Sequence, residues 1–194
     1  MLDNVKSKYI IKQILEKIKN KRKLNIIKYN KRIKIRLNIN KEDFEKYINL
    51  KEFNNQYYTY IEDIDIKELN LSNSYIRNED LKDLVKIKFT ELNKLNLSGI
   101  EISEINILEK VNFKELKELY LINNEISNIA ILEKIDFKKL KELDLSGNKI
   151  LDINILEKVN FQKLKELDLK ANKISDINIL EKVNFSTIKR IIFK

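Results

Sequence analysis

A repeat of 24 residues constrains the fold of this 194-residue chain more than any other feature. The segment ELDLSGNKILDINILEKVNF at 142–161 returns, with few changes, as ELDLKANKISDINILEKVNF at 166–185. The full units and a final partial one are 89–112, 113–136, 137–160, 161–184 and 185–194. A longer unit begins near residue 66, at a spacing of 26 residues from the next. Such a period is typical of solenoids, in which each unit packs on its neighbours.

The hydrophobic period changes within one unit. Leu143 and Leu145 alternate with charged residues, which is the period of a strand. After Asn148, apolar residues recur at every third position, which indicates a tight or short helical return. One strand and one short helix cannot enclose a core, so we expect stacked copies to bury their leucines against one another. The repeated phenylalanines are expected to form an aromatic spine beside the leucines, at Phe89, Phe113, Phe137, Phe161 and Phe185.

The segment LKELDLSGNKI resembles the leucine-rich repeat pattern LxxLxLxxNxI at every consensus position, and residues 116–126 and 164–174 match it as well. The resemblance covers residues 66–194 and is greatest to the short internalin-like class. It implies an α/β fold: a right-handed solenoid with a parallel sheet on its concave face and short helices on its convex face. It also implies a ladder of asparagines that caps backbone groups, formed by Asn124, Asn148 and Asn172. Ile100 and Ser74 interrupt the pattern, so we expect a weaker ladder in the first two units.

Charge divides the chain into two parts. Residues 1–60 contain 16 Lys+Arg against 6 Asp+Glu, whereas residues 61–194 contain 23 against 24. Amphipathic stretches in the first part, such as 5–19, predict helices. We therefore expect a basic helical cap at 1–60 that covers the first strand of a repeat array of about six strands at 61–194.

The basic part allows several interpretations. Ten basic residues and no acidic one lie between Lys17 and Arg36. This run is either a solvated face or a binding site for nucleic acid or an anionic surface. The residues expected to contact an anionic partner are Lys21, Arg22, Lys23, Lys31, Arg32 and Arg36. Residues 7–39 also resemble a divergent F-box, which implies a substrate adaptor of a ubiquitin ligase, although the motif's Leu-Pro opening and its tryptophan are absent.

Strand residues that point away from the core are expected to line the concave face in columns. Lysines would stand beside glutamates there, as on a self-neutralising surface. Tyr120 and Ile122 differ from their counterparts in the neighbouring units, which are Asn or Asp and Ser or Lys. An exposed aromatic next to an exposed aliphatic side chain is what an interface anchor requires, and drift between repeats is the alternative. The predicted partner-binding residues are Lys94, Asn96, Tyr120, Ile122, Lys141 and Asp144.

The residue inventory argues against catalysis. The chain has no histidine and no cysteine, so it lacks the commonest general base and the thiolate ligands of zinc. It also contains no phosphate-binding loop, metal-ligand cluster or nucleophile–base pair. We expect a non-enzymatic protein–protein interaction module without a cofactor. The absence of a signal sequence and of a membrane-spanning apolar run favours an intracellular, cytoplasmic location.

The final segment, FSTIKRIIFK, stops inside the strand of the sixth unit. Its outer edge would be an unpaired apolar strand, which tends to associate with other strands. Two hypotheses follow: the chain is a fragment of a longer array, or this edge pairs with a second copy.

Overall fold

The computed structural model divides the chain into two compact units, Met1–Ile64 and Asp65–Lys194. The residues it describes are 49–50, 52–57, 59, 61, 66–87, 89, 91–111, 114–182 and 187–193. In the first unit, 49–50 and 52–57 are helical, and the rings of Phe53 and Tyr57 are buried with their centroids 4.7 Å apart. The predicted anion-binding residues, the F-box-like segment and most of the predicted cap lie outside the described residues.

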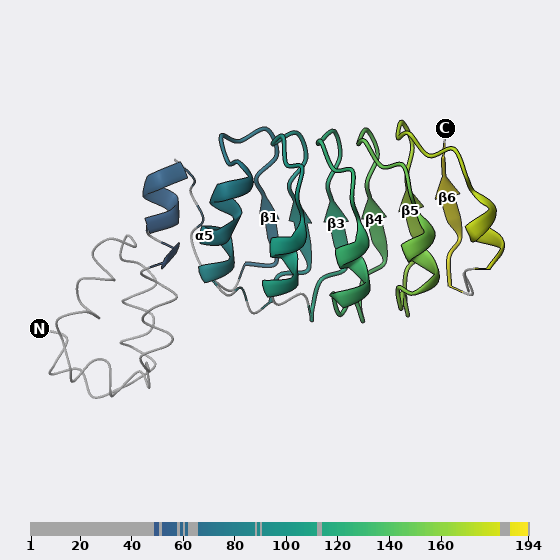
Figure 1. The fold of residues 1–194 in the computed structure, drawn as a ribbon. Coiled ribbons are helices and arrows are strands. Elements are labelled where there is room, and N and C mark those ends of the chain that lie inside the picture. Colours follow the sequence, from purple (N-terminus) through teal and green to yellow (C-terminus); the bar gives the residue numbers. More distant parts are fainter. Residues whose placement is uncertain are drawn as a thin grey trace, which may run out of the picture. The chain divides into compact units, whose positions relative to one another are not determined.

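The second unit contains a parallel sheet of six strands whose order follows the sequence (Figure 1). The strands are β1 (Glu68–Asn70), β2 (Lys94–Asn96), β3 (Glu118–Tyr120), β4 (Glu142–Asp144), β5 (Glu166–Asp168) and β6 (Arg190–Ile192). Equivalent residues of consecutive units pair in register, so that Leu119 lies between Leu95 and Leu143. The predicted parallel solenoid is therefore confirmed, and the repeat period sets its register.

Short helices return the chain along one face of the sheet (Figure 1). In the second to fifth units the described return is a single 3₁₀ helix: η3 (Asn106–Lys110), η4 (Ala130–Lys134), η5 (Asn154–Glu157) and η6 (Asn178–Glu181). These short helices with three residues per turn confirm the predicted tight return. The first return is longer: η2 (Asn78–Asp80) leads into the α-helix α5 (Leu81–Lys86). The two extra residues of the first unit are thus accommodated in its return segment.

The core is a layer of stacked aliphatic side chains between the strands and the returns. Leu143 and Leu145 are fully buried, as are their counterparts Leu119 and Leu121. Phe89 and Phe137 are buried as well, and the ring of Phe137 stacks on that of half-buried Phe161 at 6.2 Å. Phe113 and Phe185 lie outside the described residues. Each unit therefore buries its apolar residues only because a copy lies beside it.

The last unit shows what happens at the edge of this core. Ile177 is 52% exposed, whereas its counterparts Ile105, Ile129 and Ile153 are each 1% exposed. Each buried counterpart is covered by a following return, and β6 forms the edge of the sheet. Self-association through this edge strand stays a prediction.

A residue in the left-handed backbone conformation follows each of the strands β1 to β5. These residues are Asn73, Gly99, Asn123, Gly147 and Ala171, with φ angles of 53°, 65°, 51°, 67° and 52°. Glycine adopts this conformation freely, and asparagine tolerates it better than other residues that carry a Cβ atom. A Cβ atom on Gly147 would also collide with the side-chain oxygen of Asn123. Ala171 is the member of the series with no such tolerance, so its turn is strained.

Replacing Ala171 with glycine should therefore stabilise the array. The left-handed conformation costs an L-residue about 1–2 kcal/mol, and the greater flexibility of unfolded glycine offsets about 0.5–1 kcal/mol of that gain. We expect the free energy of unfolding to rise by about 0.5–1 kcal/mol in urea denaturation. The other alanine of the chain, Ala130 in η4, is exposed and has no positive φ, so Ala130→Gly should lower stability. Destabilisation by both substitutions would contradict the strain at Ala171.

Candidate partner-binding face

The residues on either side of each buried strand centre form a surface that we call the strand face. One column, in register across the six strands, is Glu68, Lys94, Glu118, Glu142, Glu166 and Arg190. The other is Asn70, Asn96, Tyr120, Asp144, Asp168 and Ile192. The central residues of β1 to β5 are buried, so these columns lie on the opposite side of the sheet from the core. The predicted columns are thereby reproduced.

Lys94, Glu118 and Tyr120 form a cluster on neighbouring strands β2 and β3. The Lys94 ammonium lies 2.8 Å from Glu118 Oε2, and the Tyr120 hydroxyl donates a hydrogen bond to the same oxygen at 3.1 Å. The ammonium also lies over the Tyr120 ring, 5.0 Å from its centroid, which is the geometry of a cation–π contact. The phenol ring is thus held by a cation on its face and an anion at its hydroxyl.

The charges of this cluster reinforce one another. Burial and the neighbouring carboxylates of Glu142 and Glu118 raise the pKa of Tyr120 well above its usual value of 10.0. The hydrogen bond with Lys94 lowers the pKa of Glu118, and the same bond raises the pKa of Lys94. At neutral pH the cluster therefore contains an ammonium, a carboxylate and a neutral phenol whose hydroxyl donates a hydrogen bond to that carboxylate.

The predicted partner-binding residues differ in their positions and in the hydrogen bonds that they form. Asn96, Tyr120 and Asp144 are neighbours in register on β2, β3 and β4. The side-chain oxygen of Asn96 accepts a hydrogen bond from the Ser98 amide at 3.0 Å, and Asp144 Oδ1 accepts one from the Ser146 amide at 2.9 Å. Both residues therefore cap turns. Lys141 is exposed and directly precedes β4.

Tyr120 and Ile122 are half-buried, although the sequence suggested full exposure. The ring of Tyr120 is covered by Lys94, and the Ile122 amide donates to Ser98 Oγ at 3.2 Å. Glu118, which joins Lys94 to Tyr120, was not among the predicted residues. The sequence could have indicated Glu118, because it stands in the same column as Lys94 and two residues before Tyr120.

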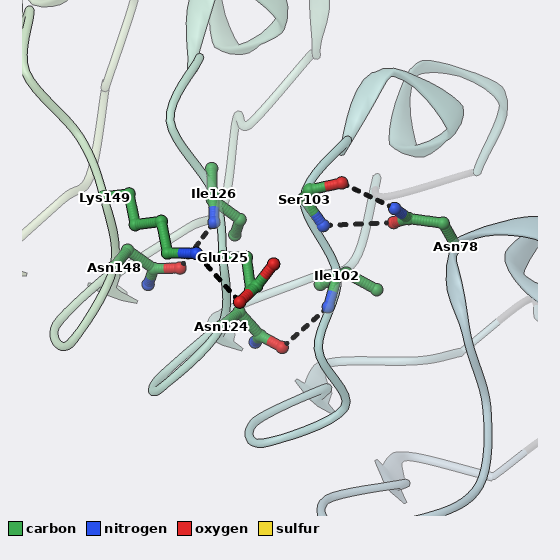
Figure 2. Close-up of polar contacts among 8 residues, drawn as sticks. All are labelled: Asn78, Ile102, Ser103, Asn124, Glu125, Ile126, Asn148 and Lys149. Carbon is green, nitrogen blue, oxygen red and sulfur yellow. Dashed lines mark hydrogen bonds and ion pairs between the residues drawn. The ribbon is translucent and has the colours of Figure 1, made fainter.

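The repeated asparagines occupy the opposite end of the strands from Lys141 and support the strand face. Asn148 Nδ2 donates hydrogen bonds to the carbonyls of Leu121 and Leu145, both at 2.9 Å, and of Ser146 at 3.2 Å. Its Oδ1 accepts a bond from the Ile126 amide at 3.1 Å (Figure 2). Asn124 and Asn172 form the equivalent bonds in their own units. Each asparagine thereby joins the backbone of two consecutive units.

The ladder has no asparagine in the first two units. Ile100 occupies the position as a buried apolar side chain, and the buried Ser74 hydroxyl has no hydrogen-bond partner among the described residues. A different contact joins these units: Asn78 Nδ2 donates to Ser103 Oγ at 2.7 Å, and its Oδ1 accepts from the Ser103 amide at 3.2 Å (Figure 2). The inserted return thus provides its own link to the second unit.

The described residues contain no group of three or more acidic residues placed to hold a metal ion. Within the same part of the chain, no helix is long and apolar enough to cross a membrane.

Comparison with known proteins agrees with this geometry. The family described as Leucine Rich repeats (2 copies) matches residues 114–158 and 138–182. The solved structure of an internalin from Listeria monocytogenes is similar at 26% sequence identity with a TM-score of 0.53, and the match covers 68% of this chain and 35% of that chain. A leucine-rich-repeat protein from Leptospira interrogans is 25% identical with a TM-score of 0.49, over 62% of this chain and 30% of the other. No curated protein matches the sequence.

The fold and the repeats together define a solenoid of leucine-rich repeats. Residues 114–182 match the leucine-rich repeat family, and the array is similar to that of an internalin, the resemblance that the sequence predicted. The match spans only about a third of the Listeria internalin, 35% of that chain.

Proposed function

We propose that the chain is a non-catalytic module that binds a protein partner on its strand face, around Tyr120. Leucine-rich repeats are interaction modules in general, and the repeats here provide an ordered array of exposed and half-buried strand residues. The observation that carries the proposal is the cluster of Lys94, Glu118 and Tyr120, where the face departs from its repeated pattern.

The cluster has the properties of an interface anchor. Tyrosine is enriched at residues that dominate binding energy, because its ring offers a large contact area and its hydroxyl a hydrogen bond. The Tyr120 ring is already fixed by Lys94 and Glu118, so little conformational entropy remains to be lost on binding. Ile122, two residues further and half-buried, extends the apolar part of the surface.

Tyr120→Ala is expected to lower the affinity for the partner about tenfold or more, because removal of a central anchor costs about 2 kcal/mol. The partner is first captured from a lysate of the source organism and identified by mass spectrometry, and its affinity is then measured by calorimetry. Tyr75→Ala is the matched control, since Tyr75 is 90% exposed and lies outside the strand face. If both substitutions leave the affinity unchanged, the proposal fails.

Salt dependence separates this proposal from the alternatives in the basic N-terminal part. Binding around Tyr120 should weaken little with added salt, whereas binding through the run between Lys17 and Arg36 should fall steeply. The F-box-like function of residues 7–39 stays a prediction, tested by capture of the ligase adaptor subunit. The cytoplasmic location also stays a prediction, tested by imaging a fluorescent fusion.

A further inference from the structure

Four lysines stand side by side where strands β3 to β6 begin. This lysine row consists of Lys117, Lys141, Lys165 and Lys189, each directly before its strand. Their backbones are hydrogen bonded in sequence: the Lys141 amide donates to the Lys117 carbonyl at 2.8 Å, and Lys165 and Lys189 continue at 2.8 and 2.7 Å. Neighbouring strands of a sheet lie about 4.8 Å apart, so the backbones of the four lysines follow one another at about that interval where the strands begin (Figure 1).

The charges of the lysine row are available to a ligand. All four residues are exposed, and none forms an ion pair with another described residue. The residue after each of the first three lysines is a glutamate of the strand face. Glu118 and Glu142 are half-buried, and Glu166 is exposed. Glu118 is already paired with Lys94. A lysine stem is also longer than a glutamate side chain, so the ammonium groups reach further from the sheet than the carboxylates.

Two further acidic residues close to the row are already paired with other lysines. Glu115 is paired with Lys139 at 2.6 Å, and Asp136 with Lys138 at 2.9 Å. Lys163, also exposed, adds a further cation beside the row. Residues 61–194 contain nearly equal numbers of acidic and basic residues, so this edge is positive because charge is separated within the array.

We propose that the lysine row binds an anionic lipid surface through headgroup phosphates and carboxylates. Binding to such a surface requires only a line of exposed cations on one side of the protein, and each lysine near the membrane adds to the attraction. Single-stranded nucleic acid is the less fitting ligand, because it is held by aromatic side chains that stack on bases as well as by cations. No aromatic residue occurs at 114–118, 138–142, 162–166 or 187–190. The proposal does not rest on the function proposed for Tyr120.

The test uses the full chain and vesicles of phosphatidylcholine with or without phosphatidylserine. Changing the four lysines of the row together to glutamine should lower partitioning onto the anionic vesicles about tenfold or more. The control changes four lysines on the returns to glutamine, at Lys110, Lys134, Lys158 and Lys182, all exposed and each beside a glutamate. This control removes the same charge but should alter partitioning by less than about twofold. The basic N-terminal run is present in all these proteins, so its contribution is common to them.

Three outcomes would overturn the proposal. In the first, the two quadruple variants lose the same affinity for anionic vesicles. In the second, the variant of the lysine row loses none. In the third, that variant loses affinity for single-stranded RNA while its vesicle binding is unchanged. Circular dichroism verifies the fold of each variant. If the quadruple variant of the lysine row fails to fold, a Lys141→Gln/Lys165→Gln double variant replaces it. Tyr120→Ala should bind vesicles normally, so a failure here is distinct from a failure of the partner-binding proposal.

Discussion

Replacing Leu143 with alanine is expected to lower the free energy of unfolding by about 2–5 kcal/mol. Leu143 is fully buried at the centre of β4 and lies in register between Leu119 and Leu167. Both neighbours are equally buried and stay in their own positions because the strands fix them. The cavity left by the shorter side chain therefore has little chance to close, which is the condition under which such substitutions cost most.

Urea denaturation of the full chain measures this effect. Leu151→Ala is the matched control, because Leu151 is 61% exposed and stands where the second, third and fifth units have serine. Its loss should change the free energy of unfolding by less than about 0.5 kcal/mol. Equal effects of the two substitutions would contradict a core formed by stacked copies.

Replacing Asn148 with alanine is expected to lower the free energy of unfolding by about 3 kcal/mol. The substitution removes bonds to the carbonyls of Leu121 and Leu145 and to the amide of Ile126. Asn148 is only 6% exposed, so water does not readily replace these bonds. A buried backbone group without a partner costs about 1–3 kcal/mol, and relaxation of the turn recovers part of the sum.

Asn154→Ala provides the comparison for Asn148. Asn154 is exposed at the start of η5, where its backbone amide bonds to Asp152 whatever the side chain is. The expected change is within about 0.5 kcal/mol. A similarly small effect at Asn148 would show that the asparagine contributes little to the stability of the array.

The repeat period predicted the parts of the fold that depend on periodicity. Alternating Leu143 and Leu145 placed the strand, the spacing of three placed the short return, and the fixed interval set the register. The contacts of individual side chains could not be obtained in this way. Lys94 meets Glu118 and Tyr120 across 24 and 26 residues of sequence, and that meeting depends on side-chain rotamers as well as on register.

Departures from the pattern were harder to interpret than the pattern itself. Tyr120 was identified by its difference from the neighbouring units, but its half-buried state follows from Lys94 and could not be read from one column. The left-handed turn at Ala171 was hidden for a similar reason. Alanine gives no local signal for that conformation, and the strain is imposed by the turn that all units share.

The shared asparagine bonds also bear on how the array comes apart. Asn148 bonds to backbone groups on both sides of a unit boundary, so one of these units cannot open without releasing part of the next. Asn124, Asn148 and Asn172 couple the second to fifth units in this way, whereas the first is joined to the second by Asn78 and Ser103. Unfolding of the repeats should therefore be cooperative from the second unit onward, with the first unit the most independent of its neighbour.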